Sequence, residues 1–213
     1  MGIEEGLTKA VKEIRENESK LKEKRKFDQT VDLIVNLKNF DVKREGFNTF
    51  VQLPHKLKDK KVAGFFEKDN KLVDVIKKEE FVKYKEKREI KKLVQKYDNF
   101  IANAKLMPAV ATAFGRVLGP VGKMPSPQLG IVPVEEDKLI EVVLGKINSA
   151  VRVMVKEPSI KVGVAKESLK DEQIVENILT AYNKIVENLP KKEENIRNVK
   201  IKFTMGGPVG VGG

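Results

Sequence analysis

Apolar and polar residues alternate most regularly in the segment 30–37, TVDLIVNL. Four apolar residues fall on one side of an extended chain: Val31, Leu33, Val35 and Leu37. On the other side only Ile34 breaks the polar pattern. This period of two predicts a strand with one buried face and one face in water. Similar alternation predicts strands at 160–165 and 199–205, and a shorter strand is predicted at 48–53.

Helical spacing of apolar residues borders these strands. Steps of three, four and seven residues predict an amphipathic helix over 3–21, and a second helix is predicted over 168–189. The two ends of the chain, 1–59 and 157–213, therefore supply helix, strand, strand and then strand, helix, strand. Together they predict an α+β domain with a four-stranded antiparallel sheet and two helices on one side, similar to a split βαβ unit.

Two further expectations concern the edges of this sheet. A short turn at 43–46 is expected to place the strand 48–53 beside 30–37 as its antiparallel neighbour. The glycine-rich end of the chain, 209–213, is expected to be frayed.

The middle of the chain follows a different pattern. Its continuous apolar run at 62–66 is typical of a strand that is covered on both faces. Helical spacing and short apolar segments then alternate, with helical patterns at 72–76, 86–97, 108–118 and 135–148 and strands at 100–102 and 151–155. This alternation predicts an inserted α/β domain over 60–156 with a largely parallel sheet. Polar linkers near 54–61 and 156–159 would form a hinge, and one continuous domain is the alternative.

Composition narrows the class of protein. The chain has 213 residues, of which 40% are apolar, so it can bury one large core or two smaller ones. It has no cysteine, no apolar run near the roughly 18 residues of a membrane span, and no basic and apolar secretory start. Its single histidine, His55, has no second ligand nearby in the sequence, so a structural role is expected. These features predict a cytoplasmic protein without disulfides, metal or cofactor.

The charge balance is strongly basic, with 42 basic and 31 acidic residues and a net charge of +11. Such an excess favours a polyanionic partner, mainly nucleic acid or an anionic membrane surface. Residues 54–159 hold 22 basic and 14 acidic residues, so most of the excess falls in the middle of the chain. Net charge alone therefore places the polyanion on the central segment.

No segment carries a recognisable catalytic pattern. The stretch 115–133, GRVLGPVGKMPSPQLGIVP, contains a fragment of a phosphate-binding loop at Gly122–Lys123. The rest of that motif is missing, because its glycine and its Ser or Thr are replaced by Val117 and Met124. A rigid loop stiffened by proline is the simpler interpretation. Arg116 and Lys123 could still contact a backbone phosphate.

Two stretches suit contact with RNA. The first, 20–26, holds five basic residues, including Lys24, Arg25 and Lys26, and is followed by an aromatic residue, Phe27. Basic charge beside an exposed aromatic side chain suits phosphates and unstacked bases, although a solvated charge run that leads into a strand is the simpler alternative. The second, Thr204–Gly207, offers a hydroxyl, a flexible apolar side chain and two positions without Cβ, where a backbone can approach a ligand closely.

Four segments resemble a known family. KRKFDQTVDLIVNL (24–37), QLPH (52–55), GRVLGPVGKMPSP (115–127) and FTMGGPV (203–209) are similar, in this order, to the universal large-subunit ribosomal protein L-one family in its archaeal form. The resemblance spans essentially the whole chain. It implies a non-enzymatic protein whose termini form an RNA-binding domain, with a Rossmann-like, three-layer α/β domain inserted between them.

The same resemblance implies partners. The first is large-subunit ribosomal RNA at the mobile side stalk. The second is tRNA in the exit site, and the protein would assist its release after deacylation. The third is the protein's own messenger RNA, whose translation the protein would repress. It also implies a ribosome-associated, cytoplasmic protein that is a monomer when free, with no cofactor and no membrane partner.

Carried onto this sequence, the resemblance implies one RNA surface on the outer domain. Its residues would be Lys24, Arg25, Lys26, Phe27, Asp28, Thr30, Asp32, Lys161, Thr204, Met205, Gly206 and Gly207, with weaker backbone contacts from Arg116 and Lys123. Phe27 and Met205 would make apolar contacts, and Thr30 and Thr204 would hydrogen-bond to 2′-hydroxyls or base edges. Lys161 stands where many bacterial members of the family have a histidine. The central excess of charge would add weaker attraction, because phosphate attraction is long-range and insensitive to sequence.

Two other classes of function stay open. A nucleotide-dependent enzyme could use the inserted α/β domain, but it would need a glycine-rich phosphate loop directly after a strand. A nonspecific, basic, chaperone-like binder would be indifferent to RNA structure.

Overall fold

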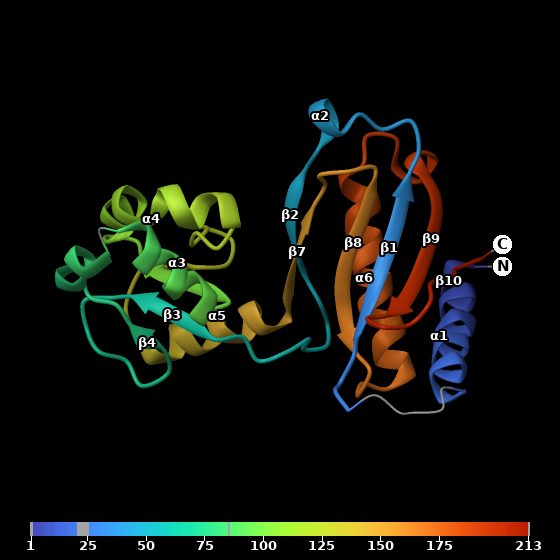
Figure 1. The fold of residues 1–213 in the computed structure, drawn as a ribbon, viewed down its shortest axis with the longest axis horizontal. Coiled ribbons are helices and arrows are strands. Elements are labelled where there is room, and N and C mark those ends of the chain that lie inside the picture. The colour runs from blue at the N-terminus through green and yellow to red at the C-terminus, as the bar shows by residue number, and fades with distance from the viewer. Residues whose placement is uncertain (1, 21–25, 85, 213) are drawn as a thin grey trace. The chain divides into compact units, whose positions relative to one another are not determined.

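A computed structural model describes residues 2–20, 26–84 and 86–212 (Figure 1). The chain forms two compact units, one made of Met1–Lys58 with Ser149–Gly213 and the other of Asp59–Asn148. These are called unit 1 and unit 2 below. Each unit has buried apolar residues of its own.

Unit 1 is built on a four-stranded sheet with the order β10-β9-β1-β8. Its strands are β1 (Thr30–Leu37), β8 (Ser159–Lys166), β9 (Ile196–Phe203) and β10 (Val209–Gly210). All neighbouring strands are antiparallel, which confirms the predicted four-stranded antiparallel sheet. The first and last long strands, β1 and β9, lie side by side although about 160 residues separate them in the chain.

The second predicted strand pairs elsewhere. β2 (Asn48–Gln52) forms a separate antiparallel ribbon with β7 (Ala150–Met154), so the predicted pairing with β1 is wrong. Both edges of β1 are already occupied by β8 and β9, which leaves no free backbone groups for β2. A short helix, α2 (Val42–Glu45), replaces the predicted turn between the strands. Through this pairing β7 becomes part of unit 1 instead of the inserted segment.

Residues 209–211 are part of the sheet, so the expectation that this stretch is frayed is wrong, while Gly213 lies outside the described residues. Val209 pairs with Ile201, and the Val211 amide donates to the Val199 carbonyl at 2.9 Å. The side chains of Val209 and Val211 are buried. Gly6 of the first helix makes room for this tail, because a Cβ there would lie 3.2 Å from the Gly212 nitrogen.

Two long helices cover one face of the sheet. They are α1 (Ile3–Ser19) and α6 (Asp171–Asn188), and α6 lies behind the strands in the view of Figure 1. Every second residue of β1 is buried, and these residues share one core with the apolar stripes of both helices. In the view of Figure 1, no helix in the described part of unit 1 lies in front of strands β1, β8 and β9. A 3-10 turn, η2 (Lys192–Asn195), leads from α6 into β9.

Unit 2 contains a parallel sheet with the order β4-β3-β5-β6. Its strands are β3 (Val62–Phe65), β4 (Asp74–Val75), β5 (Asn99–Asn103) and β6 (Ile131–Val132). Its helices are η1 (Lys78–Tyr84), α3 (Lys87–Lys96), α4 (Met107–Val121) and α5 (Asp137–Ser149). Phe65 packs in a core with α3 and α4, while the next residue, Phe66, packs in a second core with α5. Helices therefore cover both faces of a parallel sheet, and the description as Rossmann-like stays a prediction.

Two predicted elements of unit 2 differ from the structure. The segment 72–76 contains the short strand β4, where helical spacing was expected. Helix α4 also continues into the predicted proline-stiffened loop and ends at Val121; the next residue, Gly122, has a φ of 74° in the left-handed region. Glycine adopts this conformation without a steric penalty, and it ends the helix there.

Candidate nucleic-acid interface

The uncovered face of the sheet in unit 1 gathers basic residues around a short polar row. Thr30, Asp32, Ile34 and Asn36 alternate with the buried residues of β1 and point away from the core. Residues directly opposite each other in neighbouring strands share a face of the sheet. The basic cross-strand partners on this face are Lys166 and Lys161 of β8 and Lys202 and Lys200 of β9. We call these eight residues the open sheet face.

Asp32 is the single carboxylate on the open sheet face. Burial raises the pKa of its carboxyl, while the positive charges of Lys202 and Lys166 act in the opposite direction. Lys161 pairs with Glu157 at 3.0 Å, in an exposed ion pair that contributes little to stability. Even with Glu157 offsetting Lys161, three ammonium groups against the Asp32 carboxylate give this face a positive charge, and Asp32 can accept a hydrogen bond from a base amino group or a 2′-hydroxyl.

Gly163 keeps the open sheet face in this arrangement. It lies opposite Asp32 on β8, where the register between β1 and β8 shifts. A Cβ at this position would come within 2.7 Å of the Thr30 side-chain methyl and 3.3 Å of the Asp32 Oδ1 atom. A side chain there would therefore displace both neighbours.

Thr204 ties the start of β1 to the end of β9. Its Oγ1 accepts a hydrogen bond from the Thr30 amide at 3.1 Å and donates to the Thr30 carbonyl at 3.2 Å. Its own amide also donates to the Thr30 carbonyl at 3.0 Å. The hydroxyl thus bonds first of all to the protein, and one acceptor lone pair remains for a ligand. Lys166 similarly donates to the Thr30 hydroxyl at 3.1 Å.

Gln29 supports this region, although no sequence pattern marks it. Its side chain is fully buried, and its Nε2 donates to Glu18 at 2.8 Å. Its Oε1 accepts from the Met205 amide at 3.2 Å, so this one amide group connects α1 with the loop after β9. Asp28 is similarly engaged, because its carboxylate accepts hydrogen bonds from the amide and the hydroxyl of Ser168.

Two large apolar side chains are exposed near the end of the sheet. Phe27 is 52% exposed and Met205 is 57% exposed, so no element among the described residues covers either side chain fully. The two glycines after Met205 have ordinary backbone angles. A Cβ would meet no atom of the described chain within 4 Å at Gly207 and only ordinary contacts at Gly206. The fold itself does not require glycine at these positions, which is consistent with close approach by a ligand.

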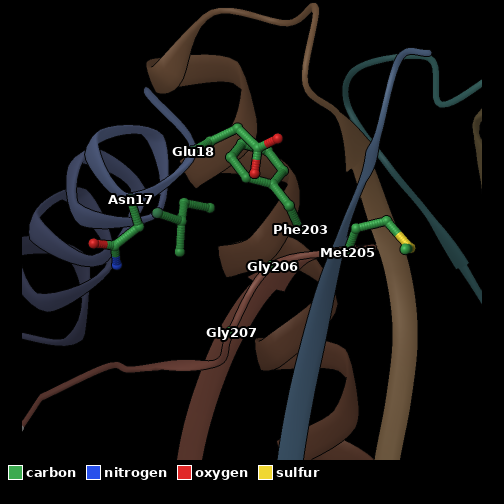
Figure 2. Close-up of a pocket in the computed structure, with 7 residues that line it drawn as sticks. Asn17, Glu18, Phe203, Met205, Gly206 and Gly207 are labelled. Carbon is green, nitrogen blue, oxygen red and sulfur yellow. The ribbon is translucent and has the colours of Figure 1, made fainter. Parts of the chain in front are cut away.

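A hollow of about 300 Å³ lies beside these residues, between the end of α1 and the loop after β9. Figure 2 shows Asn17 and Glu18 of α1 on one side and Gly206 and Gly207 on the other. The Phe203 side chain extends toward Glu18, whereas Met205 extends away from it. The lining of the hollow thus includes the Glu18 carboxylate, the Asn17 amide and the backbone of the two glycines.

Several predicted site residues are not part of this surface. Lys24 and Arg25 lie outside the residues that the structure describes, whereas Lys26 is described and exposed. Arg116 is exposed on α4 of unit 2. Lys123, also in unit 2, has another role: its Nζ donates to the carbonyls of Val94 and Tyr97, both at 2.7 Å, and so caps the end of α3.

The carboxyl edge of the parallel sheet in unit 2 is occupied by the chain itself. The Glu135 carboxylate accepts hydrogen bonds from the amides of Glu67 and Lys68, both at 3.0 Å, and from the Asn103 side chain at 2.7 Å. Burial acts to raise the pKa of Glu135, but these donors lower it overall. In open α/β sheets this edge is where nucleotide phosphates bind, so Glu135 fills the place that a nucleotide-dependent enzyme would need.

Other kinds of site find no support in the described part of the chain. No group of three or more metal-ligating His, Cys, Asp or Glu side chains occurs there. No helix of residues 2–20, 26–84 and 86–212 has the length and apolar character needed to cross a membrane.

Comparison with known proteins gives a consistent result. The model of the Ribosomal protein L1p/L10e family matches residues 12–207. The chain is 38% identical to the protein named "Large ribosomal subunit protein uL1" of Pyrococcus horikoshii, over 96% of each chain. It is 37% identical to the proteins of the same name from Nanoarchaeum equitans and Thermofilum pendens, covering 88% and 96% of this chain and 93% and 92% of theirs.

Proposed function

Because the chain belongs to the Ribosomal protein L1p/L10e family, we propose that it binds large-subunit ribosomal RNA through the open sheet face and the adjoining tip of unit 1. The tip comprises Phe27, Thr204, Met205, Gly206 and Gly207. The family consists of structural ribosomal proteins, so the chain is a structural, ribosome-associated component of the large subunit in the cytoplasm and not an enzyme.

The pairing of β1 with β9 is the observation that carries this proposal. It brings residues from both ends of the chain onto one face, where Lys202 lies opposite Asp32 and Lys161, Lys166 and Lys200 lie on the same face. Ammonium groups neutralise phosphates, and the carboxylate offers an acceptor for a 2′-hydroxyl or a base amino group. The exposed side chains of Phe27 and Met205 can pack against a ribose or an unstacked base at the end of the sheet.

Internal hydrogen bonds hold this surface in place before any RNA arrives. Thr204 fixes the ends of β1 and β9, and Gln29 fixes the backbone of Met205. Such pre-organisation reduces the entropy cost of binding, because the contacting groups need little further ordering. We therefore assign Thr204 mainly a positioning role, with one hydrogen bond to RNA through its remaining lone pair.

The finer details of the function rest on the family resemblance. We propose that the RNA site is the mobile side stalk, that the protein assists release of deacylated tRNA from the exit site, and that it represses translation by binding its own messenger RNA as a free monomer. A messenger RNA that folds into a structure similar to the stalk would present the same phosphates and unstacked bases to the open sheet face.

Binding to a transcript of the side-stalk RNA tests the proposal. The double variant Lys200→Ala/Lys202→Ala is expected to bind this transcript about tenfold more weakly, with a salt slope lower by about 1.4 to 1.8 for two lost phosphate contacts. The control variant Lys12→Ala/Lys191→Ala removes the same charge from exposed positions of unit 1 away from the open sheet face and should bind within about twofold of the original protein. Equal affinity of the original protein for the stalk transcript and for a scrambled RNA of the same length would contradict the proposal.

A further inference from the structure

A second basic site is present in unit 2, at the edge of the parallel sheet opposite Glu135. Here the chain enters strands β3, β4 and β5. A hollow of about 470 Å³ is open at this edge, and four of the side chains that line it are the lysines Lys60, Lys61, Lys71 and Lys96. We call these four residues the lysine hollow.

The lysine hollow keeps most of its positive charge. Asp74 is the one carboxylate in its lining, and it accepts a hydrogen bond from the Tyr97 hydroxyl at 2.6 Å, which lowers the pKa of Asp74. Lys96 lies 3.6 Å from the same carboxylate and 4.8 Å from the centre of the Tyr97 ring. Lys61 and Lys71 are exposed, and neither makes an ion pair with a described residue. At least two ammonium groups are therefore available to an external anion.

The other groups around the hollow offer little for recognition of a base. The Tyr97 ring is buried, so it presents no free face for stacking. The amide group of Asn70 is already used, since its nitrogen donates to Asp137 at 2.6 Å and its oxygen accepts from the Leu72 amide at 2.7 Å. What remains are the exposed ammonium groups of Lys61 and Lys71, which act as point charges and bind phosphate without fixed geometry. The site suits a repeated backbone anion better than a nucleotide or a small metabolite.

We propose that the lysine hollow binds phosphodiester groups of RNA without regard to sequence. This inference rests on the proposed function for its ligand, because RNA is the polyanion that unit 1 would bring to the same chain. The lysine hollow then takes the role that was expected of Lys123, which is contact with the RNA backbone, because the Lys123 ammonium group already donates to two carbonyls of unit 2. Unit 1 then supplies specificity, and unit 2 supplies attraction that depends on salt.

The double variant Lys61→Ala/Lys71→Ala tests the lysine hollow. Two RNA probes are used: the side-stalk transcript and an RNA duplex of arbitrary sequence. Loss of two phosphate contacts should weaken binding of both probes by a similar factor, about tenfold at low salt, and lower the salt slope by about 1.4 to 1.8. The control Lys91→Ala/Lys138→Ala removes the same charge from two exposed lysines of unit 2 that do not line the hollow, and it should leave both values nearly unchanged.

Failure of the two proposals gives different results. If the unaltered protein binds both probes equally well, the proposal of specific RNA binding by unit 1 is contradicted. Weaker binding by the Lys61→Ala/Lys71→Ala variant than by its control would still support phosphate binding by the lysine hollow. If the hollow variant and its control behave alike, the inference about the hollow is overturned, whatever unit 1 does.

Lysine acetylation of the unaltered protein gives a second measurement that needs no variant. RNA should slow acetylation of Lys61 and Lys71 by severalfold relative to Lys91 and Lys138. Polyglutamate of matched charge serves as the alternative polyanion. Protection of the hollow by polyglutamate but not by RNA would assign the site to an acidic protein and would overturn the proposal.

Discussion

Polar side chains at and beside the tip of unit 1 bond mainly to the protein, although Thr204 and Asp28 were expected to contact RNA. Thr204 bonds to Thr30, Asp28 bonds to Ser168, and Gln29 joins Glu18 to Met205. Each of these bonds, except that between Gln29 and Glu18, joins residues more than 130 positions apart, so no local sequence pattern predicts it. The sequence suggested which residues would lie near one another at this end of the sheet, but it could not show which groups face solvent and which hold the fold.

Asp32→Asn is expected to raise the free energy of unfolding of unit 1 at neutral pH. Burial raises the pKa of the Asp32 carboxyl above its ordinary 3.8, with Lys202 and Lys166 opposing this effect. The native state thus keeps the proton to a higher pH than the unfolded chain, so the stability from this group is complete below pH 3.8 and is lost as the pH rises through the raised pKa. Asparagine cannot ionise and avoids this loss.

Urea denaturation of the original protein and of Asp32→Asn, followed by NMR signals of unit 1 at about pH 3 and about pH 7, measures the effect. The advantage of the variant should be present at the higher pH and absent at the lower. A variant that is less stable at the higher pH would show that attraction to the two lysines outweighs burial.

At the scale of elements, the positions of most strands and helices were predictable, but some strand pairings were not. The alternation in 30–37 predicted β1, including which of its residues are buried. The strand at 48–53 was also correctly predicted, yet it pairs with β7 because the edges of β1 are taken by two strands from the other end of the chain. Local periodicity reports burial, whereas pairing depends on which edges remain free. The strand β10 has only two residues, Val209 and Gly210, which is too short for any periodic signal.

The tail provides a test at this scale. The double variant Val209→Ala/Val211→Ala is expected to lower the free energy of unfolding of unit 1 by about 2 to 4 kcal/mol, because both side chains are buried against its core. Pro208→Ala, at an exposed position of the same tail, is the control and should change it by less than about 0.5 kcal/mol. The same NMR-detected urea denaturation measures both, and an unchanged midpoint for the double variant would mean that the tail is frayed in solution.

At the scale of the whole molecule, the boundaries of the two units change how the net charge is divided between them. Unit 2, residues 59–148, holds 18 basic and 13 acidic residues, an excess of +5, which leaves +6 for unit 1. Net charge therefore does not favour the inserted segment once β7 and its flanking residues are assigned to unit 1. The distinction between the units lies in arrangement instead: a polar face with a carboxylate among lysines in unit 1, and a hollow of ammonium groups in unit 2.

The path of the chain suggests that unit 1 can stand alone. The Leu53 amide donates to the Ser149 carbonyl at 2.9 Å, so the segments that leave and re-enter unit 1 are neighbours. A short Gly/Ser linker in place of 59–148 is therefore expected to leave unit 1 folded, with its preference for the stalk transcript over a scrambled RNA retained. Binding measured across a salt series should show a slope lower than that of the full chain by about 0.7 to 0.9 for each phosphate that unit 2 neutralises.

That difference can be compared with the effect of the lysine hollow. If Lys61 and Lys71 supply all of the contribution of unit 2, the shortened chain and the full-length Lys61→Ala/Lys71→Ala variant should show the same salt slope within about 0.5, since each then lacks the same two contacts. A shortened chain with a much lower slope would show that other lysines of unit 2 also reach the RNA. Loss of the preference for stalk RNA in a shortened chain that is still folded would mean that specificity is not confined to unit 1.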